Sequence, residues 1–276
     1  MVRRGIAALF AKTRLAAPVA VTLLALFGCT PALAPKGIEN QTPVIESESF
    51  VTRDGLHLPL RHWDAQRPKA LIVALHGMSD YSEAFDLPGP WWAAHGITVY
   101  AYDQRGFGAS PNAGLWPGTA WLCADLDDFV EAARARFPRT PIYVLGESMG
   151  GSVVLAALAS ERPPRVDGVI LVAPAVWSRS DMPTLYRAAL WITAHTVPSV
   201  HVSGEGLHIW ATDNIPLLRK LARDRLYQHQ ARVDQVYGLV NLMDLARNAP
   251  TRLSADPPIL LLYGGNDQVI PAAPTE

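Results

Sequence analysis

The alternation of apolar and polar positions divides the chain into three parts. From residue 49 to 172, short runs rich in β-branched residues recur between segments with helical spacing. From residue 177 to 248 no strand pattern is found, and a last apolar run follows at 259–263. Strands that alternate with helices predict an α/β fold, with a mostly parallel sheet covered by helices on both faces.

The individual strands and helices can be placed from the same pattern. Strands are predicted at 49–52, 56–63, 69–75, 97–102, 141–145, 166–172 and 259–263, and helices near 91–95, 121–137, 151–159, 184–194, 215–230 and 233–246. Asp54-Gly55 between the first two strands predicts a β-hairpin. The helical stretch 177–248 is inserted between two late strands, so we expect it to form a lid.

The first 28 residues have a different character from the rest. A basic head, with Arg3, Arg4, Lys12 and Arg14, precedes an uncharged apolar stretch at 16–27, which is the pattern of a secretory signal peptide. The stretch ends in Leu26-Phe27-Gly28-Cys29, which resembles a bacterial lipobox, although the residue at position 27 is usually smaller.

The resemblance to a lipobox implies a lipid-modified Cys29 as the mature N-terminus. It also implies anchoring to a membrane of the bacterial cell envelope. The alternatives are an uncleaved membrane anchor and a cysteine that stands there by accident. Residues 29–48, rich in Pro and Ala, are interpreted as a tether to a domain at 49–276.

Composition limits the remaining classes of function. The chain has 276 residues, 49% of them hydrophobic and 18% charged, which is typical of one large globular domain. The net charge of −1 gives no electrostatic case for a nucleic-acid partner. Cys29 and Cys123 are the two cysteines, and the eight histidines form no metal-ligand pattern. We therefore expect no metal, no cofactor and no disulfide framework.

The strongest chemical signal is a nucleophile elbow. The run at 141–145 is followed by Gly146-Glu147-Ser148-Met149-Gly150. A serine between a strand and a helix sits at a strained turn, from which its hydroxyl projects above the sheet. Gly146 and Gly150 fit that turn because a Cβ at either position would collide with the neighbouring backbone. Ser148 is therefore predicted to be a nucleophile.

Three further motifs accompany the elbow. They are His76-Gly77-Met78, Tyr102-Asp103-Gln104-Arg105-Gly106-Phe107-Gly108 and Tyr263-Gly264-Gly265-Asn266-Asp267, each directly after a predicted strand. In this order the motifs resemble the α/β-hydrolase superfamily and, within it, the monoacylglycerol lipase and lysophospholipase group of serine aminopeptidase-like hydrolases. The resemblance extends from about residue 50 to the C-terminus.

The resemblance implies a role for each motif. Ser148 would form an acyl-enzyme, and the backbone amides of Met149 and Met78 would bind the oxyanion. Asp267 would be the acid that orients a catalytic histidine, while His76 would shape the oxyanion loop. Asp103 and Arg105 are expected to brace their turn. No metal or cofactor is implied.

One feature departs from the superfamily. Its triad runs serine, acid, histidine along the chain, yet none of the nine residues after Asp267 is a histidine. We therefore interpret the sequence as C-terminally incomplete, without the closing strand and helix; the alternative is a shortened, non-catalytic relative. Residues 259–262 would then form an apolar sheet edge.

Two functions are compatible with the sequence. The first is a serine ester hydrolase acting on small lipid esters, such as monoacylglycerols or lysophospholipids; a peptidase is a weaker variant. The second is a non-catalytic envelope lipoprotein that keeps the pocket for binding. Apolar lid residues either line an acyl channel or pack within the lid: Trp191, Ile192, Val197, Ile209, Trp210, Leu217 and Leu218. The sequence leaves the oligomeric state open.

Overall fold

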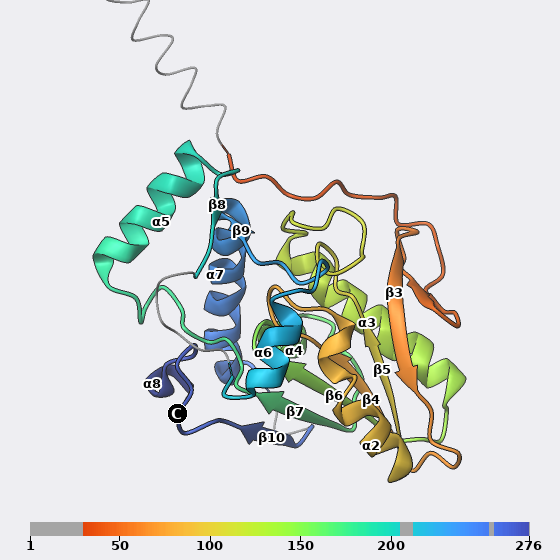
Figure 1. Ribbon diagram of the computed structural model, residues 1–276. Helices are drawn as coiled ribbons and strands as arrows, with labels where there is room; N and C mark the ends of the chain where they lie inside the picture. Colours follow the sequence, from red (N-terminus) through yellow and green to blue (C-terminus); the bar gives the residue numbers. More distant parts are fainter. Residues whose placement is uncertain (1–29, 205–211, 254–256, 276) are drawn as a thin grey trace, which may run out of the picture.

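The computed structural model describes residues 30–204, 212–253 and 257–275, and its centre is one eight-stranded sheet (Figure 1). The strands are β1 (Val44–Ile45), β2 (Ser49–Val51), β3 (His57–Trp63), β4 (Ala70–Leu75), β5 (Ile97–Tyr102), β6 (Ile142–Glu147), β7 (Gly168–Val172) and β10 (Ile259–Leu262). Their order is β1-β2-β3-β5-β4-β6-β7-β10, antiparallel from β1 to β5 and parallel from β5 to β10. The predicted α/β fold is confirmed.

Helices cover both faces of the sheet. They are η1 (Ser82–Phe85), α2 (Pro88–Ala94), α3 (Thr119–Arg136), α4 (Met149–Leu158), α5 (Thr184–Thr196), α6 (Ile215–Leu221), α7 (Val233–Asn248), η2 (Ala249–Thr251) and α8 (Ala272–Thr275). Along β4, Leu71 and Val73 pack with residues of α3 and α4, whereas Ile72 packs with Phe85 and Trp92 of η1 and α2. This alternation explains the continuous apolar run of β4, because both of its faces are buried.

The segment expected to be a tether lies against the domain in the part that is described. Val44 and Ile45 form β1, which pairs with β2. Further along, the Ala34 amide donates to the Trp116 carbonyl (2.8 Å), and the Ala32 amide donates to Asp234 Oδ2 (3.2 Å). Backbone pairing of this kind cannot be recognised from composition alone. Cys29 and the predicted signal peptide lie outside the described residues.

The lid differs from the prediction in two details. Helix α6 is shorter than the predicted 215–230, and the two-residue strands β8 (His201–Val202) and β9 (Ala231–Arg232) pair with each other. Helix α7 packs against α4 and joins the main core through Leu242 and Ala246, so only part of the insertion is a separate cover. No helix in the described parts of the chain is long and apolar enough to cross a membrane.

Strand β10 is the edge of the sheet beyond β7 (Figure 1). It pairs in parallel with β7, and all four of its residues, Ile259 to Leu262, are exposed. The apolar edge expected from the sequence is therefore present.

Candidate active site

Ser148 occupies the turn between β6 and α4 in a strained backbone conformation. Its φ of 50° and ψ of −115° are unusual for a residue with a side chain. The turn is held by the Ser148 amide, which donates to the Val172 carbonyl (3.0 Å), and by the Ala175 amide, which donates to the Ser148 carbonyl (2.9 Å). The surrounding backbone thus holds Ser148 in a strained conformation, which costs on the order of 1–3 kcal/mol.

The glycines of the elbow allow three backbone segments to meet. A Cβ on Gly146 would lie 2.6 Å from the Gly150 carbonyl, and one on Gly150 would lie 2.3 Å from the Leu75 carbonyl oxygen. Neither distance is sterically possible. Only glycine therefore lets α4 approach β6 on one side and β4 on the other.

The loop after β4 runs beside the nucleophile. A Cβ on Gly77 would lie 3.3 Å from Ser148 Cβ, and the neighbouring Met78 lines the same cavity as Ser148. Met149, the first residue of α4, is fully buried behind the serine. Amides at a helix N-terminus carry partial positive charge. Both residues expected to bind the oxyanion thus adjoin Ser148.

His76 is a structural residue rather than a base. It is fully buried, its Nδ1 donates to the Gly77 carbonyl (2.8 Å), and its Nε2 accepts from the Gln104 amide (3.0 Å). Burial lowers the pKa of this imidazole, so the neutral form is favoured. With both ring nitrogens engaged, His76 holds the loop after β4 against the turn that begins at Gln104.

The motif at 102–108 likewise braces the loops. Asp103 accepts hydrogen bonds from the amides of Ser82 (3.0 Å) and Ala109 (2.9 Å). Arg105 is buried between Asp54 and Asp125, with nitrogen–oxygen distances of 2.6 to 2.7 Å. The guanidinium of Arg105 is occupied by these two carboxylates, so its role is to stabilise the fold of the turn.

Ser148 opens into a cavity of about 620 Å³. Asp267 lines the same cavity, at the end of the loop after β10. Its Oδ1 accepts hydrogen bonds from the amides of Val269 (2.8 Å) and Ile270 (2.9 Å), which fix the carboxylate in an Asx turn. The structure therefore places the predicted nucleophile and the predicted acid around one space.

Most of the cavity wall is apolar and comes from the lid. The apolar and aromatic lining residues from the lid are Trp177, Met182, Tyr186, Leu190, Leu217, Leu221, Tyr227, Val236, Leu239, Val240 and Met243; Met78, Ala173, Ala175, Val269 and Ile270 line the cavity from outside the lid. Of the seven lid residues named from the sequence, Leu217 belongs to this wall. The expectation was wrong for Trp191, Ile192 and Val197, which are exposed, and Leu218 does not line the cavity. Ile209 and Trp210 lie outside the described residues.

Apart from Leu217, the lining residues of the lid were not identified from the sequence, although their spacing carried a signal. Tyr186 and Leu190 are four residues apart on α5, and Val236 and Val240 are four apart on α7. Side chains at this spacing share one helix face. The i, i+4 pattern was therefore the signal for the inner face of each helix.

Two carboxyl groups at the cavity were also missed. Glu147 and Asp80 both line it. Burial, reinforced by the charge of Asp80, raises the pKa of Glu147 to about 7, and burial raises the pKa of Asp80 to about 6 although the Tyr81 amide hydrogen-bonds it. The end of the cavity next to Ser148 is therefore polar, and burial shifts both carboxyl groups toward the protonated form.

No histidine in the described ranges lines this cavity. In the lid, His195 Nδ1 bonds to the Trp191 carbonyl (2.7 Å), His229 Nε2 bonds to the Asp224 carbonyl (3.0 Å), and His201 is exposed on β8. His208 lies outside the described residues. Nor do the described residues contain a cluster of three or more potential metal ligands.

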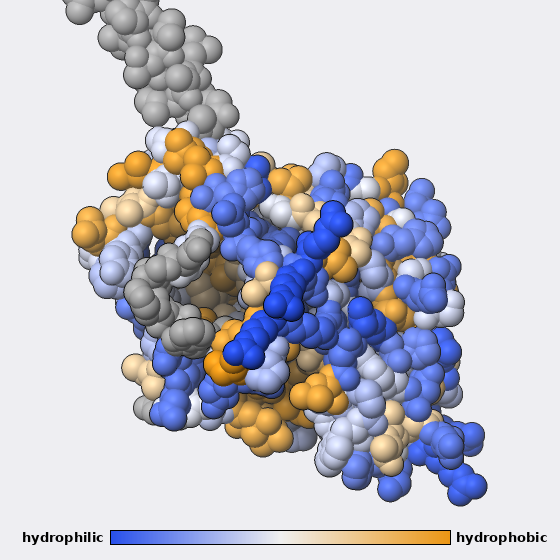
Figure 2. All heavy atoms as spheres, in the orientation of Figure 1, coloured by the Kyte–Doolittle hydropathy of each residue, from blue (hydrophilic) through white to orange (hydrophobic). Residues whose placement is uncertain are grey.

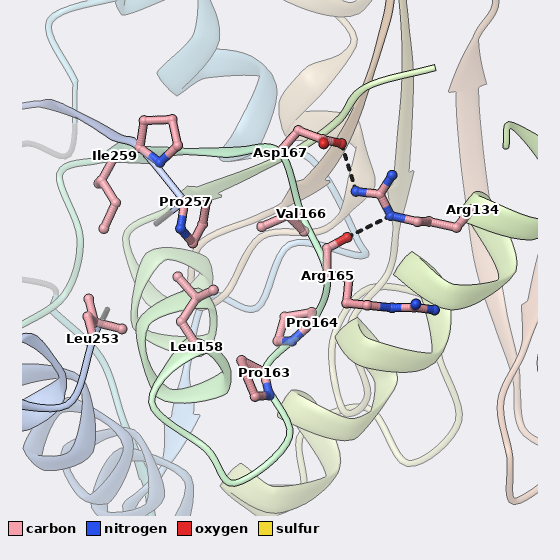
Figure 3. A pocket seen from close by; sticks show the side chains of 11 residues that line it. Arg134, Leu158, Pro163, Pro164, Arg165, Val166, Asp167, Leu253, Pro257 and Ile259 are labelled. Carbon is pink, nitrogen blue, oxygen red and sulfur yellow. Dashed lines mark hydrogen bonds and ion pairs between the residues drawn. The ribbon is translucent and has the colours of Figure 1, made fainter. Parts of the chain in front are cut away.

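A second cavity, of about 450 Å³, lies at the amino ends of β7 and β10, so it is at the opposite ends of the strands from Ser148 (Figure 3). Arg134 points across it, and its guanidinium bonds to Asp167 Oδ2 (2.7 Å) and to the Arg165 carbonyl (2.8 Å). Ligand sites of open α/β sheets lie at the carboxyl ends of the strands. Ser148 lies at that end, and this cavity does not.

A parallel sheet with a strained serine elbow at its carboxyl edge defines an α/β hydrolase. Residues 66–276 match the family described as serine aminopeptidase, S33, and the chain belongs to that family. Monoglyceride lipase of Rattus norvegicus is 27% identical over 248 residues, covering 86% of this chain and 78% of that protein. Phospholipase YtpA of Bacillus subtilis is 28% identical over 210 residues, covering 75% and 80%.

A solved structure is similar in fold. It is a soluble variant of monoglyceride lipase from Saccharomyces cerevisiae in complex with a substrate analog, with a TM-score of 0.68 and 18% identity over 88% of this chain and 84% of that one. The solved structure supports the fold, whereas the family and the curated relatives identify the protein as a carboxylic ester hydrolase.

Proposed function

We propose that the protein hydrolyses small lipid esters, such as monoacylglycerols or lysophospholipids, through an acyl-enzyme on Ser148. The observation that carries the proposal is the strained Ser148 at a cavity whose wall is mostly apolar. Such a cavity suits an acyl chain, and the polar end beside Ser148, with Asp80 and Glu147, suits a hydroxylated head group. The similarity to monoglyceride lipases and to a phospholipase supports this substrate class.

In the proposed reaction, Ser148 Oγ attacks the ester carbonyl carbon while a base takes its proton. The amides of Met78 and Met149 stabilise the oxyanion that forms. The bond to the alcohol oxygen then breaks, and the alcohol leaves with the proton. Water attacks the acyl-enzyme in the same manner, releasing the fatty acid and restoring Ser148. Asp267 is assigned to orienting the base.

A fluorophosphonate probe tests the nucleophile directly. Because no histidine of the described residues lines the cavity with Ser148, labelling should be slow; after prolonged incubation we expect peptide mapping to find the label on Ser148, and Ser148→Ala to abolish it. Ser160, an exposed hydroxyl just beyond α4, is an internal control, and it should stay unlabelled because exposure alone does not activate a serine. Labelling that persists in Ser148→Ala would refute the assignment. A chain that binds monoacylglycerol without any labelling would favour the non-catalytic binding lipoprotein.

We extend the proposal to location, with the protein anchored in the cell envelope by a lipid on Cys29. Support comes from the basic head, the apolar stretch at 16–27 and the sequence Leu26-Phe27-Gly28-Cys29. Radiolabelled palmitate fed to expressing cells should enter the wild type and not Cys29→Ser. No incorporation into the wild type would refute lipidation.

A further inference from the structure

The segment at 224–228, which follows α6 in the lid, is bonded to the core loops beside Ser148. The Gln228 amide donates to the Ser79 carbonyl (2.8 Å), and the Tyr81 hydroxyl donates to Asp224 Oδ2 (2.7 Å). Figure 2 shows hydrophilic side chains gathered over α6 and the segment that follows it. The outer side of this part of the lid therefore meets water, while its inner side is tied to the loop after β4.

The side chain of Gln228 joins this segment to two further elements. Its Nε2 donates to the Gly106 carbonyl (2.8 Å), in the turn at 102–108, and its Oε1 accepts from Gln235 Nε2 (3.0 Å) on α7. Gln235 is fully buried, and its own Oε1 has no hydrogen-bond partner among the described residues. A carboxamide is the neutral group that can donate and accept at the same time, and Gln228 uses both abilities.

The loop that receives the Gln228 amide carries one of the two amides proposed to bind the oxyanion. The Met78 amide shares a peptide plane with the Gly77 carbonyl, which accepts from the Asp80 amide (3.3 Å). Ser79, the next residue, has a φ of 73°, which is unusual for a residue with a side chain. Such a conformation persists only where the surroundings hold it, and the bond from Gln228 to the Ser79 carbonyl holds it from the lid.

From these contacts we infer that Gln228 is a positioning residue for the oxyanion site. Its two side-chain hydrogen bonds fix the 224–228 segment, and the segment fixes the loop at 76–80, which aims the Met78 amide. The inference rests on the proposed function, because it takes the oxyanion role of Met78 from there. It adds that the lid and one oxyanion donor form a single unit, whereas Ser148 is held by the core alone.

The variant Gln228→Met tests the inference, because methionine keeps the length of the side chain and offers no N–H donor. Gln230→Ala is the matched control, since Gln230 is an exposed residue of the same type two positions further along. Each variant of the full chain is incubated with a fluorophosphonate that carries a long alkyl chain. Time courses at several probe concentrations separate the maximal rate of Ser148 labelling from the concentration that gives half of it.

We expect Gln228→Met to lower the maximal labelling rate by roughly tenfold or more, since a displaced oxyanion donor stabilises the transition state less. The half-saturating probe concentration should stay within about twofold of the wild type, because the apolar cavity wall binds the alkyl chain. Gln230→Ala should match the wild type in both quantities. An unchanged maximal rate in Gln228→Met, or an equal loss of rate and probe affinity, would overturn the inference.

Hydrogen exchange followed by mass spectrometry examines the loop without relying on catalysis. In Gln228→Met the amides of residues 76–81 should exchange faster by roughly tenfold, because the loop opens more often, and in Gln230→Ala they should not. Gln235→Met removes one bond of Gln228 together with a buried unpartnered acceptor, so it should fold and show the same changes to a smaller extent.

The two measurements separate this inference from the proposed function. Wild-type protein that is never labelled on Ser148 would refute the proposed nucleophile, and hydrogen exchange would then decide alone whether Gln228 holds the loop. Unchanged exchange at 76–81 in both Gln228→Met and Gln235→Met would overturn the inference even if Ser148 is labelled normally.

Discussion

The two sides of the active site are built in different ways. On the β6–α4 side, Ser148 is fixed by main-chain contacts so close that Gly146 and Gly150 admit no Cβ. On the β10 side, Asp267 follows a strand whose residues are exposed, and Gly264 and Gly265 of its loop have no neighbour within 4 Å of a built Cβ. Ser148, the proposed nucleophile, is thus positioned by the core, whereas Asp267, the proposed acid, depends on local hydrogen bonds at a sheet edge.

Ser148 is therefore held more precisely than Asp267. A strained residue persists only where its surroundings over-determine it, and β4, β6 and α4 do this for Ser148. The Asx turn that holds Asp267 is local and needs no core. Perturbations should therefore affect the two sides unequally.

The largest expected effect is on catalytic activity, and it concerns the general base for Ser148. Neither side of the site supplies a histidine within the described residues. We expect the purified 276-residue chain to hydrolyse short-chain p-nitrophenyl esters more slowly than an ordinary enzyme by about three powers of ten or more. No histidine of the described residues lines the cavity with Ser148, and without a base mainly the oxyanion hole and binding act. Turnover on the order of 1 per second, abolished by Ser148→Ala, would contradict this. The lid histidines would then be the next residues to substitute.

The next largest effect compares two glycines. Gly150→Ala would place a Cβ 2.3 Å from the Leu75 carbonyl oxygen, so we expect it to lower the free energy of unfolding by about 3–5 kcal/mol. Gly264→Ala, in open space on the other side of the site, should change it by less than about 0.5 kcal/mol. Urea denaturation of both variants checks the comparison. Equal losses would mean that the two sides are equally constrained.

The sequence predicted the Ser148 side of the site well and the lid side poorly. The elbow and its glycines are signalled by a short motif between a strand and a helix, because the steric requirement is local. For the lid, the sequence left open whether its large apolar residues line an acyl channel or pack within the lid. Leu217 lines the cavity, whereas Trp191 and Ile192 are exposed and do neither. Which face of an amphipathic helix turns inward depends on packing against α7, and that is a tertiary property.

The docking of residues 32–45 and the half-buried carboxyl groups of Asp80 and Glu147 could not be predicted from the sequence for a related reason. A tether and an edge strand can have the same composition, and only the pairing of β1 with β2 distinguishes them. Glu147 and Asp80 are far apart in the sequence, and nothing in the sequence indicates that both line one cavity.

A smaller effect tests the burial of Glu147. Its pKa is raised from 4.5 to about 7, so the folded state favours the protonated form. The resulting stability is fully present below pH 4.5 and is lost as the pH rises through about 7. Glu147→Gln should therefore raise the free energy of unfolding by on the order of 1–2 kcal/mol at pH 8, and should have little effect at pH 4. The exposed Glu161→Gln is the control, and a pH-independent effect of Glu147→Gln would contradict the assignment.

The smallest effect on stability is expected at the exposed edge. Leu260 of β10 is 53% exposed, and its replacement by Thr keeps a residue that favours strands. Leu260→Thr should change the free energy of unfolding by less than about 0.5 kcal/mol. Yet an exposed apolar edge strand promotes aggregation, so the fraction of monomer in solution should rise.

Val144→Thr in the central strand β6 is the matched variant. This side chain is 1% exposed, and a buried hydroxyl without a partner costs about 1–3 kcal/mol. Size-exclusion chromatography and urea denaturation measure the two consequences separately. A stability loss at Leu260 equal to that at Val144 would show that β10 is as well packed as the central strands. The contrast between the two sides of the site would then have to rest on the elbow alone.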